Sequence, residues 1–144
     1  NPADRRLLTD FWGDGLQDDE SAQILDELAP TEADTVLTKW RYSAFVRSPL
    51  EKQLKELGRD QLIISGVYAH IGCLTTALEA FMRDIQPFMV ADALADFTEE
   101  DHRMACEYAS GRCARVLDTA EVLAQITAGA PGADGAPETG KARA

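Results

Sequence analysis

The sequence predicts a three-layer α/β domain, in which helices cover both faces of a mainly parallel, doubly wound sheet. Short β-rich runs alternate with amphipathic helical patterns through the middle of the chain, as in strands joined by crossover helices. The run Gln61-Leu62-Ile63-Ile64-Ser65 is almost continuously apolar, as expected of a strand that is covered on both faces. Only four strands are predicted, whereas complete doubly wound domains have about five or six.

Hydrophobic period and turn residues place each element along the chain. The predicted strands are residues 34–38, 61–65, 86–91 and 114–117. The first predicted helix begins near residue 4. Further helices are predicted at about residues 21–28, 48–58, 70–84, 98–112 and 119–126.

Capping residues mark the ends of several predicted helices. Ser48 is followed by proline at the first helical position, and Gly58 closes that helix. Thr98 and Thr119 are predicted N-caps of the last two helices.

Composition excludes several classes of partner. The net charge is −11, so we expect no binding to nucleic acid or to an anionic membrane, which both need a cationic face. No apolar run approaches the ~18 residues that cross a bilayer. The 3 cysteines are an odd number without tight spacing, which favours a reducing cytoplasm and gives little support for a metal site. We expect no cofactor.

The domain organisation follows from the same patterns. Residues 1–126 are predicted to form the folded domain, and the Ala/Gly/Pro-rich residues 127–144 to be a flexible tail or linker. Because a helical pattern begins almost at Asn1, we expect the chain to be part of a longer protein.

Functional loops of a parallel sheet lie at the carboxyl ends of its strands, which here follow Thr38, Ser65 and Ala91. Lys39 lies directly after the first strand, where its charge can act on a carboxylate or an anionic substrate. It can equally be a rim lysine whose stem covers apolar surface.

His70 and Cys73 open the helical segment after the second strand. They can be a base and a thiolate nucleophile at a helix N-terminus, or an unrelated pair with a buried cysteine. Cys106 and Cys113 are predicted to lie in the core, and His102 is predicted to be solvated. Asp92 and Asp96 are predicted to be turn or capping residues.

Five blocks of sequence together resemble an isochorismatase, a member of the isochorismatase-like (cysteine hydrolase) superfamily, from about residue 4 to residue 123. They are DFWGDGL (10–16), DELAP (26–30), LTKWRYSAF (37–45), GRDQLIISGVYAHIGCLTTALEAFMRDIQPFMVADALADF (58–97) and GRCARVL (111–117).

The resemblance implies an enzyme that hydrolyses the vinyl ether of isochorismate to 2,3-dihydro-2,3-dihydroxybenzoate and pyruvate, in siderophore biosynthesis. A phenazine-type enzyme acting on 2-amino-2-deoxyisochorismate is the close alternative. A cysteine amidohydrolase using Cys73, and a non-catalytic scaffold that docks a carrier protein, are further alternatives. The family also implies a homodimer, and an aryl carrier domain or synthetase as partner.

Carried over by position, the resemblance assigns catalytic roles to Lys39 and Gly72, the latter standing where related amidases have their cysteine. It assigns substrate binding to Arg5, which pattern alone treats as a surface residue, and to Tyr68, and it implies a cis peptide between Val67 and Tyr68. Trp12, Tyr42 and Phe45 are expected to line the pocket.

One part of the family pattern is missing from this sequence. The family's acid is an aspartate in an HDMQ-like motif on the first strand, and neither that motif nor the family's substrate-binding glutamine occurs in the 144 residues. We therefore expect the first two strands, in roughly 60–80 residues, to lie upstream or to come from another chain. We expect this chain alone to be inactive, and a true truncation that has lost activity stays a third possibility.

Overall fold

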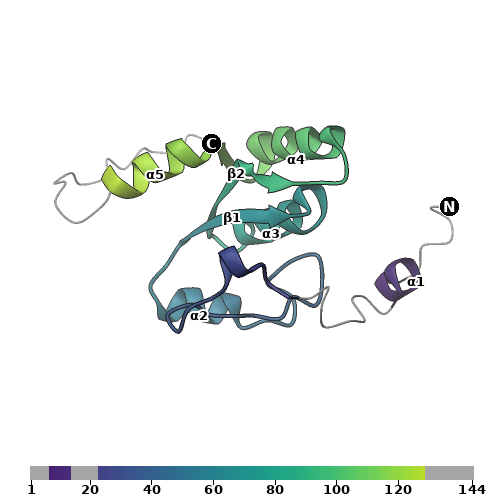
Figure 1. Cartoon of the computed structure of the whole chain (residues 1–144), viewed down its shortest axis with the longest axis horizontal. Helices are drawn as coiled ribbons and strands as arrows, with labels where there is room; N and C mark the ends of the chain where they lie inside the picture. The colour runs from purple at the N-terminus through teal and green to yellow at the C-terminus, as the bar shows by residue number, and fades with distance from the viewer. Residues whose placement is uncertain (1–6, 14–22, 129–144) are drawn as a thin grey trace, which may run out of the picture. The chain divides into compact units, whose positions relative to one another are not determined.

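The chain is arranged in two compact units in the computed structural model, which describes residues 7–13 and 23–128 (Figure 1). Residues 1–36 make the first unit and the remaining residues make the second. The predicted domain, residues 1–126, spans both units, so its extent stays a prediction.

The described part of the first unit, residues 7–13 and 23–36, contains little regular structure. A short helix, α1, covers Leu8–Trp12, and a 3-10 turn, η2, covers Asp26–Leu28. The longer helix predicted for residues 21–28 is wrong over its described part, because residues 23–25 have no regular structure. Leu25 and Leu28 are exposed, so this segment lacks the packing surface from which most short helices gain their stability.

The strand predicted for residues 34–38 is also wrong. Residues 35–40 have no regular secondary structure, and no described segment pairs with them. A β-rich run becomes a strand only when another strand satisfies its backbone N–H and C=O groups, and Val36 stays exposed.

The second unit is built on a three-stranded parallel sheet in the order β1-β2-β3. The strands are β1 (Gln61–Val67), β2 (Gln86–Ala95) and β3 (Arg115–Leu117). Their positions confirm the three strands predicted in this part of the chain. Ile64 pairs with Met89, and the register then shifts before Gly66 pairs with Leu94.

Helices cover both faces of this sheet. On one face, Met89 packs in a cluster with residues of α3 (Leu74–Phe81) and α4 (Glu99–Arg112). On the other face, Phe88 and Val90 pack with Val122 of α5 (Thr119–Ala128). Because successive side chains of a strand point to opposite faces, this alternation confirms the three-layer α/β class.

β1 is less covered than the sequence predicts. Of its residues only Ile64 is buried, so the expectation of a strand covered on both faces is wrong. β2 is its one neighbour strand among the described residues, and Ile63 and Val67 remain exposed. The central strand β2, which lies between β1 and β3, carries the continuous buried run 87–90 instead.

The helix termini follow the predicted capping with two corrections. The first is that the N-cap of α2 is Pro49 and not Ser48. α2 covers Leu50–Glu56, the Ser48 hydroxyl accepts a hydrogen bond from the N–H of Leu50, and Gly58 closes the helix with a φ of +62°. Thr98 accepts the N–H of Asp101 and caps α4 as predicted.

The cap of α5 is Asp118 and not Thr119. The Asp118 carboxylate accepts the N–H of Glu121 at 2.7 Å, and the Glu121 carboxylate accepts the N–H of Asp118 at 2.9 Å. This reciprocal pair is a capping box. Thr119 instead donates its N–H and its hydroxyl to Asp92, as the predicted capping role of that aspartate requires.

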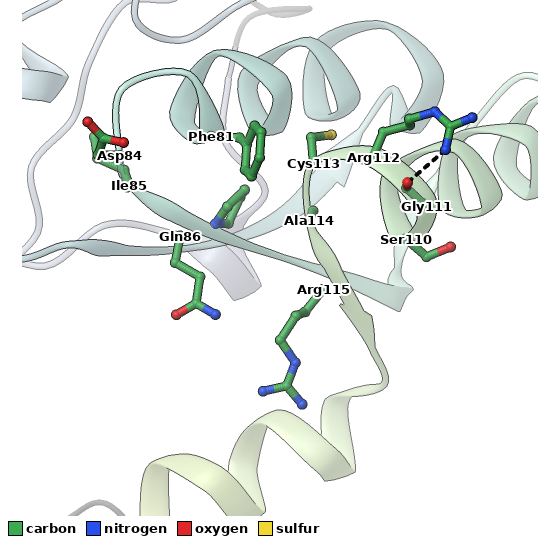
Figure 2. A pocket seen from close by; sticks show the side chains of 11 residues that line it. Phe81, Asp84, Ile85, Gln86, Ser110, Gly111, Arg112, Cys113, Ala114 and Arg115 are labelled. Atoms are coloured by element: carbon green, nitrogen blue, oxygen red, sulfur yellow. Dashed lines mark hydrogen bonds between the residues drawn. The ribbon is translucent and has the colours of Figure 1, made fainter. Parts of the chain in front are cut away.

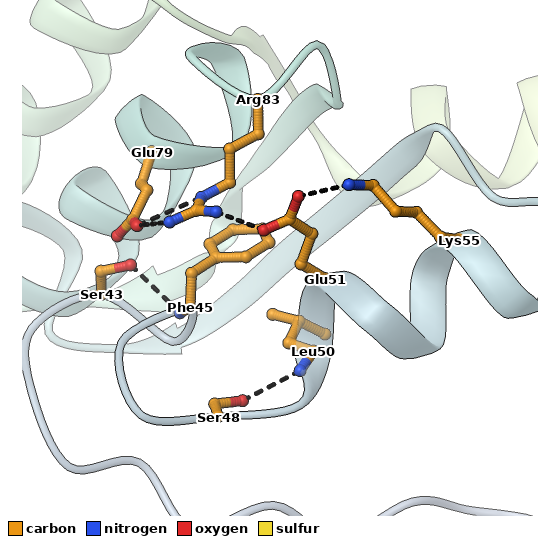
Figure 3. A network of polar contacts seen from close by, with 8 residues as sticks. All are labelled: Ser43, Phe45, Ser48, Leu50, Glu51, Lys55, Glu79 and Arg83. Atoms are coloured by element: carbon orange, nitrogen blue, oxygen red, sulfur yellow. Dashed lines mark hydrogen bonds and ion pairs between the residues drawn. The ribbon is translucent and has the colours of Figure 1, made fainter.

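A polar network joins α2 to α3 on the surface (Figure 3). The Arg83 guanidinium binds the carboxylates of Glu51 and Glu79, and it lies 5.2 Å from the centre of the Phe45 ring. Lys55 completes the network by donating to Glu51 at 2.6 Å. These contacts hold residues 43–49, which follow Tyr42, and the start of α2 against α3.

Truncation of the central core residue tests this packing. Met89 has no exposed surface and lies on the middle strand. Met89→Ala is expected to lower the free energy of unfolding in urea by about 2–5 kcal/mol, because it leaves a cavity between β2 and the helices. Leu57→Ala is the matched control, since that side chain is exposed and should cost less than about 0.5 kcal/mol. Equal losses for both variants would contradict the assignment of Met89 to the core.

Candidate active site

The turn that follows β1 forms the floor of the candidate site. The peptide between Val67 and Tyr68 is cis, as the resemblance implies. The Tyr68 carbonyl then accepts three backbone N–H groups, from Ile71 at 3.2 Å, Gly72 at 3.0 Å and Cys73 at 3.2 Å. The π-helical turn η3 (Ala69–Cys73) results, and it continues directly into α3.

Lys39 and Gly72, which are 33 positions apart in sequence, meet above this turn. A methyl group on the Cα of Gly72 would lie 2.9 Å from Lys39 Nζ and 3.5 Å from the Tyr42 carbonyl oxygen. The absence of a side chain at position 72 therefore leaves room for the ammonium group. Partial burial lowers the pKa of Lys39, and the neighbouring Cys73 opposes that shift.

Thr76 holds the loop that carries Tyr42 against the turn. Its hydroxyl donates to the Gly72 carbonyl at 2.7 Å and accepts the N–H of Ala44 at 3.0 Å. This buried hydroxyl was not among the residues predicted from sequence. Its only sequence signal was its place one helical turn after Gly72.

Asp96 fixes the other side of the turn. It follows the carboxyl end of β2, and its carboxylate accepts the His70 N–H at 2.6 Å and the Phe97 N–H at 2.8 Å. His70 Nδ1 lies 2.7 Å from the same carboxylate. Burial would raise the pKa of Asp96, but these hydrogen bonds outweigh it and hold the pKa below its usual value. His70 is therefore the partner of Asp96.

Cys73 lies in the core beside this turn. Its side chain is 6% exposed and packs in the same cluster as Ala77 and Met89. Burial raises the pKa of its thiol, Lys39 lowers it, and Asp96 raises it further. The net increase disfavours the thiolate that a nucleophile needs. Cys113 is buried and Cys106 half-buried, and both are free, in line with the predicted core roles.

The predicted binding residues differ in their burial and in their contacts, and one of them lies outside the described residues. Tyr68 is 41% exposed, and its ring stacks on Phe97 with centroids 4.0 Å apart. Phe45 is buried in a cluster with Ala80 and Ile85, which gives it a packing role. Trp12 ends α1 in the first unit, and Arg5 lies outside the described residues. The substrate-binding roles stay predictions.

His102 corrects another expectation. It was predicted to be solvated, but it is half-buried and its Nε2 lies 2.9 Å from the Ala91 carbonyl oxygen.

Within the described part of the chain, His70, Asp96 and Asp101 bring three potential metal-ligand atoms within 4.8 Å of one another. Internal N–H groups already occupy both Asp96 oxygens, and Asp101 accepts the Thr98 hydroxyl at 2.7 Å. These bonds account for the cluster without an ion.

A cavity of about 510 Å³ lies at the other end of the sheet (Figure 2). Its walls include Pro87 and Arg115, at the amino ends of β2 and β3, and Arg112, which donates to the Gly111 carbonyl. The Lys39–Gly72 pair lies at the carboxyl end of β1, so this cavity is separate from the candidate site.

No helix of residues 7–13 or 23–128 is long and apolar enough to cross a membrane.

A parallel sheet with helices on both faces and polar groups at the carboxyl ends of its strands defines a three-layer α/β fold of the doubly wound class. The family comparison is more specific, because it matches residues 5–121 to the isochorismatase domain. The chain belongs to the isochorismatase domain family.

Individual relatives agree with this assignment. The chain is 63% identical over 121 residues to enterobactin synthase component B of Escherichia coli K12, covering 83% of this chain and 42% of that protein. It is 54% identical over 120 residues to phenazine biosynthesis protein PhzD1 of Pseudomonas aeruginosa, covering 83% of this chain and 58% of that protein. The chain thus spans about half the length of these relatives.

A solved structure supports the fold. An isochorismatase family protein from Burkholderia thailandensis superposes with a TM-score of 0.75 at 25% sequence identity. The match covers 78% of this chain and 60% of that one.

Thiol reactivity tests the assignment of Cys73. Burial raises the pKa of both thiols, but Cys73 is the more deeply buried, so native Cys73 is expected to react with iodoacetamide more slowly than the half-buried Cys106. The rate at Cys73 should still be rising above pH 9, and the difference should disappear in denaturant. Peptide mass spectrometry measures each site. Fast labelling of Cys73 near pH 7 would contradict its burial and revive a thiol mechanism.

Proposed function

We propose that the complete protein that carries this chain is an isochorismatase, which hydrolyses isochorismate to 2,3-dihydro-2,3-dihydroxybenzoate and pyruvate. The observation that carries the proposal is Lys39 Nζ above the bare Cα of Gly72. A cation at a site without a nucleophilic side chain suits the binding and protonation of an anionic enol ether. It does not suit attack on an amide.

The proposed reaction begins with proton transfer to the methylene carbon of the enolpyruvyl group. The electron pair of the carbon–carbon double bond forms the new C–H bond, and the ether oxygen stabilises the resulting oxocarbenium ion. Water adds to that cation and loses a proton, and the hemiketal then breaks its C–O bond to release pyruvate and the diol. A positioned acid and a partly dry pocket are the requirements of this reaction.

Lys39 is proposed to assist that acid rather than to replace it. Its ammonium group would hold a carboxylic acid or a substrate carboxylate above Gly72, where partial burial strengthens the attraction. The acid itself is assigned by resemblance to an aspartate of an HDMQ-like motif, which does not occur in these 144 residues. Activity is therefore a property to be tested on the complete protein.

Tyr68 is proposed to contact the substrate, with its ring oriented by the stack on Phe97. Tyr42, with its carbonyl oxygen beside Gly72, is proposed to form another part of the wall, together with Phe45 and Trp12. Arg5 is proposed to bind a substrate carboxylate through its planar guanidinium. The roles of Tyr68 and Tyr42 rest on the resemblance and on the geometry around the turn, whereas those of Phe45, Trp12 and Arg5 rest on the resemblance alone.

A siderophore pathway is proposed over a phenazine pathway. The support is the higher identity to enterobactin synthase component B, 63%, than to the phenazine protein PhzD1, 54%. We propose an aryl carrier domain or synthetase as partner, a homodimeric assembly and a cytoplasmic location. All three cysteines are free, as a reducing compartment would keep them.

Three substitutions in the complete protein test the mechanism by a pyruvate-release assay. Lys39→Met is expected to lower kcat/KM at least about 100-fold, because it removes the cation at the reacting centre. Gly72→Ala is expected to lower kcat/KM with little loss of stability, since its methyl group displaces only the end of a flexible side chain. Cys73→Ala is expected to keep kcat within about threefold of the unsubstituted enzyme, corresponding to under 1 kcal/mol.

The same assay separates the alternatives. Loss of pyruvate release in Cys73→Ala, with the fold intact, would support a thiol mechanism and contradict the proposal. A higher kcat/KM on 2-amino-2-deoxyisochorismate than on isochorismate would favour the phenazine-type function. Binding of a separate aryl carrier domain without any pyruvate release would favour the scaffold.

A further inference from the structure

Asp96 has more partners than a turn residue needs. Its side chain has no exposed surface, although it lies at the end of β2 among exposed neighbours. Oδ2 accepts the backbone N–H of His70 at 2.6 Å. Oδ1 accepts the backbone N–H of Phe97 at 2.8 Å and lies 2.7 Å from His70 Nδ1. An ionised carboxylate can only accept hydrogen bonds, so Nδ1 carries a proton and donates it.

Both partners of Asp96 belong to the candidate site. His70 lies within η3, two residues before Gly72, and its N–H and ring are both held. Phe97 carries the ring on which Tyr68 stacks, with an angle of 20° between the ring planes. The edge of the His70 ring faces the same Phe97 ring at 6.2 Å. One carboxylate thus connects the backbone of the turn to the aromatic side chain above it.

The sheet explains why the residue directly after β2 can make these contacts. Val67 pairs with Ala95 at the ends of two parallel strands, so the residues that follow each strand leave the sheet side by side. Asp96 comes next after Ala95, and the cis turn comes next after Val67. The contact therefore joins the two strand ends at the point where the site begins.

We propose that Asp96 is a positioning residue of the candidate active site. Through His70 it fixes the η3 turn and thereby the place of Gly72 under Lys39, and through Phe97 it fixes the orientation of Tyr68. The consequence for catalysis rests on the proposed isochorismatase function. The consequence for the geometry of the turn does not.

Asparagine cannot replace this aspartate. With its NH2 group in the place of Oδ2 it would face the His70 N–H, and in the place of Oδ1 it would face the Phe97 N–H. Either orientation leaves a backbone donor without an acceptor. Asp92→Asn is the matched control, because Asp92 lies on β2 shortly before Asp96 and accepts two hydrogen bonds, but from Thr119.

Amide hydrogen exchange on the complete protein tests the positioning directly. In Asp96→Asn, exchange at Gly72 and Cys73 is expected to rise about tenfold or more relative to the Met89 amide of the same sample, which reports global opening. In Asp92→Asn this ratio should stay at the value of the unsubstituted protein. An unchanged ratio in Asp96→Asn overturns the proposal, whether or not the protein releases pyruvate.

Enzyme kinetics separate the effect of Asp96 through Phe97 from its effect through His70. Phe97→Leu removes the ring stack without burying an unpaired polar group, so it is expected to raise KM roughly three- to tenfold with kcat nearly unchanged. The same substitution in a Tyr68→Ala background should have no further effect, because Phe97 acts only through Tyr68. Additive effects would overturn this arm of the proposal.

Asp96→Asn is expected to lower kcat as well as raise KM, since it also releases the turn that carries Gly72. If this variant does not fold, the Phe97 and Tyr68 cycle still tests the contact through Phe97, and additive effects there overturn that part of the proposal. If the unsubstituted protein releases no pyruvate, the proposed function fails, and hydrogen exchange alone decides whether Asp96 positions the turn.

Discussion

The candidate site depends on one tightly bonded turn at the end of β1. Three backbone N–H groups converge on the Tyr68 carbonyl, and the buried Asp96 carboxylate holds the His70 residue of the same turn from the neighbouring strand. Gly72 and Cys73 are buried within this turn, so leaving their N–H groups unpaired would be costly. Gly72 is held in this turn through its own N–H, which donates to the Tyr68 carbonyl, and through its carbonyl, which accepts the Thr76 hydroxyl.

Lys39 can lie above this turn because Gly72 has no side chain. Lys39 Nζ occupies the space that a Cβ of residue 72 would approach to 2.9 Å, and the Tyr42 carbonyl borders it. Cys73 is next in sequence but packs into the core on the far side, where burial raises its pKa. A one-residue difference along a helical turn rotates a side chain by about 100°, which is enough to separate a site position from a core position.

Much of the second unit could be predicted from sequence because its signals are local. The apolar run of β1, the capping threonine of α4 and the glycine after α2 each specify their element without help from distant residues. The strand at 34–38 and the double-sided burial of β1 were wrong for one reason. Both depend on segments distant in sequence. Within residues 7–13 and 23–128 no strand pairs with residues 34–38, and β1 has β2 as its one neighbour strand. Asp96 was assigned to a turn because His70, its partner in the turn after β1, is distant from it in sequence. The pairing of Val67 with Ala95 was the signal that could have found it.

The most direct test of the central claim is a crystal structure of the complete protein with its product bound. The account predicts that pyruvate or the diol lies above Gly72, with an oxygen atom of the ligand or of the catalytic acid within about 3 Å of Lys39 Nζ. Cys73 Sγ should remain buried and make no contact with the ligand. A product bound against Cys73, or at a distance from Lys39 and Gly72, would contradict the account.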